Sequence, residues 1–253
     1  GFDAIIRIKK GFLMKSSLIV VGKALRYNTA FLNYIHSTIT KHIDLPDQTV
    51  YIDKNDKDLF FVLEETIAHA DEIIPNINEI ATYFENIIIT QDWHPEDHIS
   101  FAQNHANKNP FDTVELDYGT QVLWPSHCVQ GTHDAELHPD LKLSTAQLII
   151  RKGFHRHIDS YSAFMEADHK TTTGLSGYLK ERAIDTVFVV GIATDFCVAW
   201  TAIDAVNLGF KTFVIADATK GIDLNGSLQQ AWQDMLDAGV HRINRKDLIQ
   251  QQA

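Results

Sequence analysis

A cysteine between a strand and a helix is the residue of this chain best suited to nucleophilic chemistry. Cys197 ends the segment Gly191–Cys197 (GIATDFC), which follows the apolar run Thr186–Val190 and precedes a helical pattern over Val198–Leu208. A thiol at a helix start lies near unpaired N–H groups and the positive end of the helix dipole, and both lower its pKa. The same N–H groups suit an oxyanion. The alternative is a small buried apolar residue, the usual role of a free cysteine.

Lys152 is the cation that is placed best to assist this thiol. It follows the apolar pattern Ala146–Arg151, so in a parallel sheet it points over the same rim as Cys197. There it would stabilise a thiolate or a developing oxyanion; a solvated lysine at a strand end is the alternative. Cys128 lacks the strand–turn–helix context, and we interpret it as structural. Asp195 is expected to cap the helix that follows it.

Acidic and imidazole side chains gather where another strand ends. Asp92, His94 and His98 follow the β-branched run Asn86–Thr90, and His127 lies in the later segment WPSHC. An Asp-x-His pair in extended chain points both side chains to one face. One carboxylate with imidazoles suits Zn, Fe or Mn. The alternative is a chance cluster of surface histidines, because the chain has 13 of them.

Two aromatic residues, Trp124 and Tyr161, are ambiguous in the same way. They belong either to the core or to the wall of a pocket for a flat ring, since both have a large apolar body and a polar tip.

The elements that must position these residues alternate between short apolar strands and helices. We expect strands over 14–21, 86–90, 146–151, 186–190 and 211–216, and helices over 70–84, 173–182, 198–208 and 227–238. This alternation predicts an α/β fold whose parallel sheet is covered on both faces, with the site beyond the carboxyl ends of the strands. The polar region 91–128 reads as a long functional loop rather than packed structure. Residues 22–69 show no matching rhythm.

Composition narrows the classes of partner. The net charge of −11 argues against nucleic acid and anionic membranes, which select basic patches. No apolar run reaches the length of a membrane span. With only two cysteines in 253 residues, a reduced cytoplasmic setting is the simpler interpretation.

Several motifs in order give the chain a family resemblance. The segments TQDWHPEDHISF, LWPSHCVQGT, IIRKGF, DSYSAF and VVGIATDFCVAWTAIDA resemble those of nicotinamidases in the isochorismatase-like cysteine hydrolase family. The resemblance runs from about residue 70 to the C-terminus and also covers Met14–Val21. It implies a three-layer fold with a six-stranded parallel sheet. It further implies hydrolysis of nicotinamide to nicotinate and ammonia in NAD salvage, and often cleavage of pyrazinamide.

The resemblance also assigns roles to residues. Cys197 matches the nucleophile that forms a thioester, and Lys152 matches the lysine of an Asp-Lys-Cys triad. The N–H groups of Ala193 and Cys197 match the oxyanion hole, and the Ile192–Ala193 bond matches a cis peptide. The positions that match ligands of one divalent metal ion (Zn, Fe or Mn) are Asp92, His94, His98 and His127. That metal would bind the pyridine nitrogen, in a pocket to which Trp124, Tyr161 and Ile192 belong.

The first strand departs from the family. In members of the family this strand ends in an aspartate that serves as general base, whereas in this chain Val21 is followed by Gly22. We therefore expect one isochorismatase-like domain over 1–253 with an atypical segment at 22–69, and a nicotinamidase with impaired activity. The alternatives are an inactive protein that binds nicotinamide and a metal, or another hydrolase of this fold. A homo-oligomer is compatible with the sequence.

Overall fold

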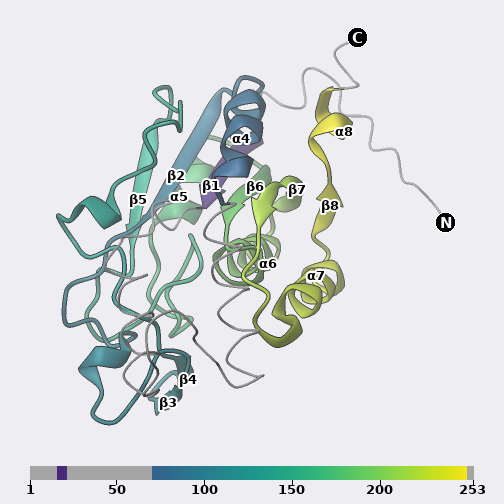
Figure 1. The fold of residues 1–253 in the computed structure, drawn as a ribbon. Coiled ribbons are helices and arrows are strands. Elements are labelled where there is room, and N and C mark those ends of the chain that lie inside the picture. The colour runs from purple at the N-terminus through teal and green to yellow at the C-terminus, as the bar shows by residue number, and fades with distance from the viewer. Residues whose placement is uncertain (1–15, 22–69, 250–253) are drawn as a thin grey trace, which may run out of the picture.

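The computed structural model of the chain describes residues 16–21 and 70–249, and it is built around one parallel sheet (Figure 1). Six strands run in the order β5-β2-β1-β6-β7-β8, and every neighbouring pair is parallel. Their bounds are β1 Ser16–Val21, β2 Asn86–Asp92, β5 Leu148–Lys152, β6 Thr186–Ile192, β7 Lys211–Lys220 and β8 His241–Ile243. The predicted six-stranded parallel α/β fold is confirmed.

The inner strands are apolar because both faces of the sheet are covered. Every residue of β6 (TVFVVGI) is buried, and so are Leu18 and Ile19 of β1. A strand that is buried on both sides reads as a continuous apolar run rather than an alternating one. The run at 186–190 therefore gave the right strand, although its carboxyl end extends to Ile192.

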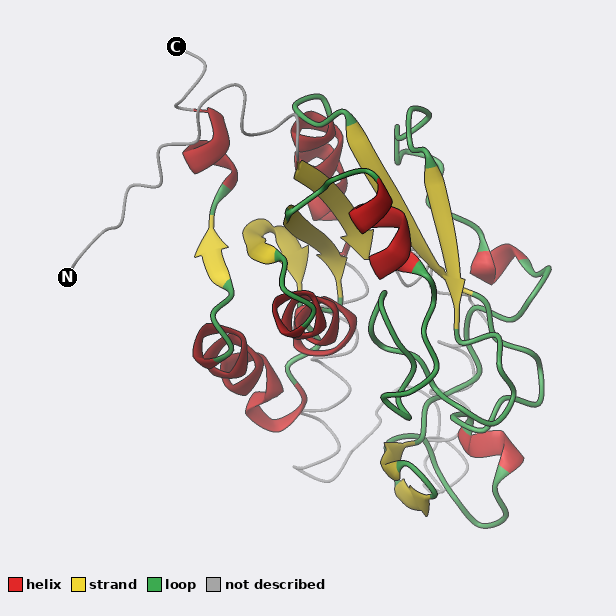
Figure 2. Ribbon diagram, turned by 180° about the vertical axis from the view of Figure 1, so that it is seen from behind, coloured by secondary structure: helices red, strands yellow, loops and turns green. Residues whose placement is uncertain are grey.

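Helices cover the two faces of the sheet. Helix α4 (Ile74–Ala81) lies on one face, while α5 (Leu175–Glu181), α6 (Ala199–Asn207) and α7 (Ser227–Asp237) lie on the other (Figures 1 and 2). The helix expected over 70–84 is shorter, because a 3₁₀ turn at Ala70–Ile73 precedes α4. Pro75 lies in the first turn of α4, where its missing N–H removes no helical hydrogen bond. The chain ends in α8 (Arg245–Ile249), which, like β8, was not expected.

The region 91–128 is not the unstructured loop that its polarity suggested. It contains an antiparallel hairpin of β3 (Thr113–Leu116) and β4 (Gly119–Val122), with residue pairs from Thr113–Val122 to Leu116–Gly119. The hairpin lies away from the main sheet, at the bottom of Figure 1. Its strands are short, and half of their residues are exposed, so they lack the long apolar run by which the strands of the main sheet are found.

β2 and β5 lie on one side of β1, and the later strands β6, β7 and β8 lie on the other, so the strand order reverses beside β1. In open α/β sheets this switch point is where ligands bind, beyond the carboxyl ends of the strands. Asp92 and Lys152 are the last residues of β2 and β5 and are paired in the sheet register. Gly22 and the rest of the segment 22–69 lie outside the described residues, so the missing base stays a prediction.

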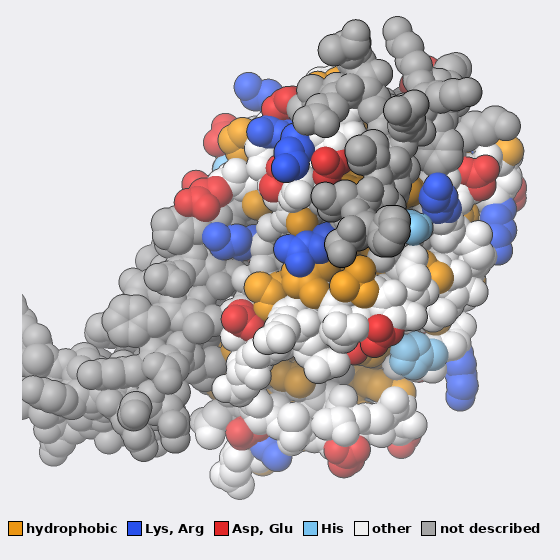
Figure 3. Space-filling model, turned by 90° about the vertical axis from the view of Figure 1, so that its right-hand side faces the viewer, with side chains coloured by type: hydrophobic (Ala, Val, Ile, Leu, Met, Phe, Trp, Pro, Cys, Tyr) orange, Lys and Arg blue, Asp and Glu red, His pale blue; other side chains and the backbone are white. Residues whose placement is uncertain are grey.

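Two observations concern the described helices and the charged side chains of the surface. None of the described helices has the length and apolar character that crossing a membrane requires. On the face drawn in Figure 3, acidic and basic side chains are interspersed rather than separated by sign.

Candidate active site

Cys197 lies in a tight turn that joins β6 to α6. The turn, Thr194–Val198, is π-helical, and Cys197 is fully buried in it. The N–H groups of Phe196 and Val198 both donate to the carbonyl of Ala193, each at 3.1 Å. The expected strand–turn–helix arrangement is thus confirmed, and the Ile192–Ala193 peptide is cis, as the resemblance implied. The two residues proposed for the oxyanion hole, Ala193 and Cys197, lie just before and within this turn.

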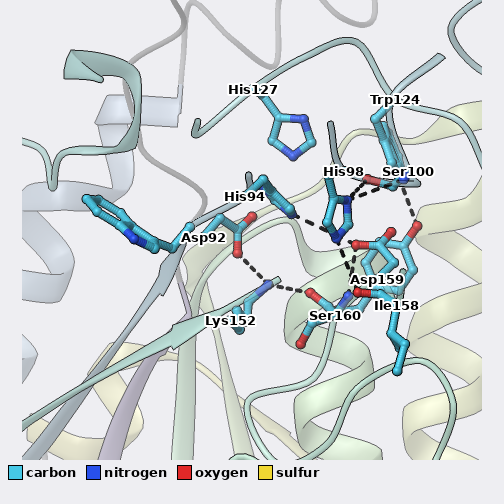
Figure 4. Close-up of polar contacts among 12 residues, drawn as sticks. Asp92, His94, His98, Ser100, Trp124, His127, Lys152, Ile158, Asp159 and Ser160 are labelled. Atoms are coloured by element: carbon cyan, nitrogen blue, oxygen red, sulfur yellow. Dashed lines mark hydrogen bonds and ion pairs between the residues drawn. The ribbon is translucent and has the colours of Figure 1, made fainter. Parts of the chain in front are cut away.

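Lys152 connects the cysteine to the acid at the end of β2. Its Nζ lies 2.5 Å from Asp92 Oδ1 and donates to the carbonyl of Ser160 at 2.8 Å (Figure 4). The same Nζ lies 3.5 Å from Cys197 Sγ. Burial by itself lowers the pKa of a lysine, but the negative charges of Asp92 and Cys197 outweigh it, so the pKa of Lys152 is raised. Lys152 therefore stays an ammonium ion near neutral pH.

Three of the four expected metal ligands come together. One ligand atom from each of Asp92, His94 and His127 lies within 4.8 Å of the other two. Parallel bridges His94–Val129 and Phe101–Trp124 align the two segments that carry the imidazoles, although these segments are some thirty residues apart in the sequence.

A hydrogen bond from its Nδ1 orients the ring of His127. Its Nδ1 lies 2.8 Å from the carbonyl of Pro125, which can only accept, so the proton is on Nδ1 and the lone pair is on Nε2. Fixing the tautomer through the other ring nitrogen is how proteins orient metal-binding histidines. A carboxylate and two imidazoles are a donor set that suits Zn, Fe or Mn.

His98, the fourth candidate, is engaged differently. Its Nδ1 lies 2.7 Å from the hydroxyl of Ser100, and its Nε2 lies 3.1 Å from the carbonyl of Ile158 (Figure 4). Its ligand atom is grouped with those of His94 and Asp159 rather than with Asp92 and His127. Burial lowers the pKa of His98, so the ring is neutral in this setting. We interpret His98 as a support for its neighbours more readily than as a ligand.

Phe101 stands among the three imidazoles, and sequence reasoning missed it. Its ring is fully buried, and its centroid lies 5.3 Å from that of His94, 5.6 Å from His98 and 5.4 Å from His127. Phe101 ends the segment TQDWHPEDHISF, which stands out in the sequence for its acidic and imidazole side chains. An aromatic residue in a polar stretch carries no sign that it will face a histidine cluster.

Gly153, directly after Lys152, leaves room for one of these rings. It has a φ of +69°, and a Cβ built on it would lie 2.5 Å from His94 Nε2. Real Cβ atoms do not come that close to another heavy atom, so any side chain here would displace the imidazole.

The expected pocket aromatics are joined in one hydrogen-bonded group. Trp124 Nε1 donates to the hydroxyl of Tyr161 at 2.8 Å, and the Trp124 and Phe196 rings meet edge to face with centroids 5.0 Å apart. Gln121 donates from its Nε2 to Asp159 Oδ2 at 2.7 Å and to the Tyr161 hydroxyl at 3.2 Å. Burial, and then the charge of Asp159, raise the pKa of Tyr161 well above its usual value, so its hydroxyl is neutral. Asp159 and Gln121 are further residues that the sequence did not reveal.

Asp195 does not have the role expected of it. Its carboxylate accepts the N–H groups of Ile222 and Asp223 at 3.0 and 2.8 Å and the hydroxyl of Ser227 at 2.5 Å. It therefore fastens the cysteine turn to the chain that enters α7, instead of capping its own helix. The reason is that the segment after β7 brings three donors to it, which a sequence-local pattern cannot show. Cys128 is buried, and its carbonyl accepts the N–H of His94, in agreement with a structural role.

Comparisons with known proteins agree with this geometry. A family profile of the isochorismatase domain matches residues 57–247. A nicotinamidase of Acinetobacter baylyi is 70% identical over 183 residues, which cover 72% of this chain and 86% of that protein. The solved structure of a nicotinamidase and pyrazinamidase of Acinetobacter baumanii has a TM-score of 0.76 and 60% identity, and the match covers 93% of this chain and 98% of that one. A pyrazinamidase of Pyrococcus horikoshii, solved in complex with zinc, has a TM-score of 0.60 and 27% identity over 91% of this chain and 99% of that one.

Proposed function

The chain belongs to the isochorismatase family, and on that premise we propose that it hydrolyses nicotinamide to nicotinate and ammonia. The observation that carries the proposal is the position of Lys152, whose ammonium lies between Asp92 and the thiol of Cys197. A buried cation in contact with a buried thiol favours the thiolate, which is the nucleophilic form. By the same family likeness, pyrazinamide is proposed as a second substrate.

Cys197 attacks the amide carbonyl in the first half of the reaction. A bond forms between Sγ and the carbonyl carbon, and the electron pair of the C=O bond moves to oxygen. We propose that the N–H groups of Ala193 and Cys197 hold this oxyanion, as donors fixed in advance. When the carbonyl re-forms, the C–N bond breaks, and the amine leaves as ammonia after it has taken up the proton that the thiol gave up.

Water completes the second half of the reaction. It adds to the thioester carbonyl, the C–S bond breaks, and nicotinate leaves while the sulfur recovers its proton. Each half thus moves one proton between sulfur or water and the departing group. Lys152 stays protonated and stabilises negative charge, so it does not perform this transfer itself.

A metal ion fits the group of Asp92, His94 and His127, and we propose one divalent ion (Zn, Fe or Mn) there. When bound, it would hold the ring nitrogen of the substrate and so fix the position of the amide. Trp124, Tyr161 and Ile192 are proposed to line the ring pocket, with His98 supporting the histidines from outside. The zinc complex of the Pyrococcus horikoshii pyrazinamidase supports the choice of ion class.

The chain lacks the family's proton acceptor at the end of the first strand. In the sequence Val21 is followed by Gly22, where the family has its general base. General acid–base groups contribute about 10²–10⁴-fold to a rate, so we expect a slow enzyme. The competing function is a protein that binds nicotinamide and a metal without turnover.

An ammonia-release assay with nicotinamide separates these possibilities. We expect slow, metal-dependent release by the chain as it is, none by Cys197→Ala, and a rate higher by about 10²-fold or more in Gly22→Asp. Binding of nicotinate without any release by the chain or by Gly22→Asp would favour the binding protein. Absence of both binding and release would refute the proposed function.

The domain, the partner and the cellular setting are also part of the proposal. We propose that residues 1–253 form one domain, that nicotinamide is the small-molecule partner, and that the setting is cytoplasmic. The last rests on the two cysteines, Cys128 and Cys197, which form no disulfide in the described part of the chain.

A further inference from the structure

Gln121 is a buried residue of the β3–β4 hairpin that reaches the centre of the site. Only 2% of it is exposed, although most of the hairpin around it faces solvent. Its Nε2 lies 2.7 Å from Asp159 Oδ2, 2.7 Å from the carbonyl of Val122 and 3.2 Å from the hydroxyl of Tyr161. Its Oε1 lies 3.0 Å from the hydroxyl of Tyr118. The two N–H protons of the amide thus face three acceptors, so the longer contact to Tyr161 shares a proton with one of the two shorter contacts, while Oε1 accepts from Tyr118.

The orientation of this amide is fixed by the chemistry of its partners. The Asp159 carboxylate and the Val122 carbonyl can only accept hydrogen bonds, so they require the NH₂ end of Gln121. The opposite orientation would place the amide oxygen against both of them. Tyr118 then donates its hydroxyl proton to Oε1 and accepts the N–H of Asp159 at 3.3 Å, which closes a ring between the hairpin and Asp159.

Gln121 lies between the histidine group and the pocket aromatics. On one side is Asp159, whose Oδ1 lies 3.9 Å from Nε2 of His94 in the histidine group. On the other side is Tyr161, whose hydroxyl also accepts the indole N–H of Trp124 at 2.8 Å. The indole is a donor only, so Tyr161 is what fixes its plane on that edge.

We propose that Gln121 is a positioning residue that holds the Trp124 wall at a set distance from the histidine group, through Tyr161 on one side and Asp159 on the other. The substrate ring would lie between that wall and the metal ligands, so this inference rests on the proposed function. The hairpin thereby has a task in ligand binding, because Gln121 and Tyr118 are its contribution to the site.

The effect expected from losing the amide follows from what its partners would lack. In Gln121→Leu, which keeps a similar volume, Asp159 Oδ2 and the Tyr161 hydroxyl each lose a buried donor. Losing a hydrogen bond to a buried carboxylate typically weakens a site by about tenfold. Since the amide does not touch the reacting atoms, we expect weaker ligand binding and a higher KM, with kcat changed much less.

The experiment compares Gln121→Leu with Thr120→Val on the same strand. Thr120 is exposed and donates to Glu115 at 2.7 Å, so its variant also removes a hairpin hydrogen bond, but one outside the group. The primary readout is the Kd of nicotinate, which can be measured whether or not turnover is fast. The second readout is intrinsic fluorescence, repeated in a Trp124→Phe background to isolate Trp124 from the other three tryptophans.

We expect Gln121→Leu to weaken nicotinate binding about tenfold and to shift the emission only when Trp124 is present, while Thr120→Val changes neither. The effect of Gln121→Leu on Kd should shrink in a Tyr161→Phe background, because the two residues act through one contact. Tyr118→Phe, which releases the amide oxygen and removes the acceptor of the Asp159 N–H but keeps the Gln121 NH₂ contacts, should give a smaller loss in the same direction and serves if Gln121→Leu does not fold.

A lower thermal stability with unchanged nicotinate affinity and unchanged Trp124 emission would overturn the inference, because Gln121 would then be structural only. Full additivity of Gln121→Leu and Tyr161→Phe would overturn it as well. A wild-type chain that does not bind nicotinate refutes the proposed function instead, and the Trp124 emission still decides whether Gln121 positions the indole.

Discussion

The two halves of the site are held in opposite ways. Around Lys152, a buried ammonium joins a carboxylate, a carbonyl and a thiol, so that half is organised by charge. Around Phe101, three imidazoles surround an apolar ring, and two of them are oriented by neutral hydrogen bonds: His98 by Ser100 and the Ile158 carbonyl, and His127 by the Pro125 carbonyl. The first half should therefore fail when charge is removed, and the second when volume or shape is changed.

Removing the charge of Lys152 should have the largest effect. Lys152→Met leaves Asp92 buried without its cation, and removing one partner of a buried ion pair costs about 3–5 kcal/mol. The thiolate also loses its counter-ion, so ammonia release should fall by about 10²-fold or more. Urea unfolding and the ammonia assay measure the two effects.

The matched control for that variant is Lys180→Met, on the exposed side of α5. It should change the free energy of unfolding by no more than about 0.5 kcal/mol. Equal losses in the two lysine variants would show that charge does not organise the Lys152 half.

Adding one methyl group beside the histidines should have the next largest effect. In Gly153→Ala, the new Cβ would overlap His94 Nε2, so the ring must move. We expect metal affinity to fall by about 10–100-fold, the range seen when the support of a ligand is disturbed. Metal content after dialysis against a buffered series of free Zn²⁺ measures this.

Gly174→Ala separates the clash from backbone strain. Gly174 also has a positive φ, +89°, but nothing lies within 4 Å of a Cβ built there. Both variants should lose stability, and only Gly153→Ala should lose metal. A normal metal affinity in Gly153→Ala would mean that the His94 ring is not held by shape.

Removing volume from the centre of the histidine group should have a moderate effect. Phe101→Leu opens a cavity between the imidazoles and should destabilise the fold by about 1–3 kcal/mol. Phe164→Leu, at an equally buried ring that stacks on Phe210, should cost a similar amount. Only the first should weaken metal binding, by about tenfold; parallel metal titrations would expose the contrary result.

The smallest effect concerns how the stability of the fold depends on the ionisation of Tyr118. Burial raises the pKa of Tyr118 to about 12, against about 10 in an unfolded chain. The folded state therefore keeps this proton longer, so the stability it contributes is present below pH 10 and is lost as pH rises from 10 to 12. Unfolding midpoints between pH 9 and 11 should fall less steeply for Tyr118→Phe than for the parent chain. Identical slopes would contradict this assignment.

The sequence predicts what depends on short-range pattern and misses what depends on distant contacts. The β-branched run before Asp92 and the apolar run before Gly191 identify strands, because burial on both faces leaves a continuous apolar record. The family motifs then place Cys197, Lys152 and the candidate ligands at the rim where the structure has them.

The contacts that the sequence did not predict join residues that are far apart along the chain. Gln121 is polar and lies in a hairpin of weak pattern, so nothing local indicates that it will be buried against Asp159, 38 residues later. Asp195 binds N–H groups 27 and 28 residues away, whereas the local rule expects it to cap the next turn. Such contacts are decided by how elements pack, and composition or periodicity does not record packing.

The register between β2 and β5 has a consequence for folding itself. Side chains of a strand alternate between two faces, so pairing the strands one residue out of step would turn Lys152 away from Asp92. Lys152 would then point to the face of β5 on which Ile149 and Arg151 are exposed, and Asp92 would be left buried without its cation, which is unfavourable. Asp92 and Lys152 thus also favour the correct register of β2 and β5, because only that register pairs the two buried charges.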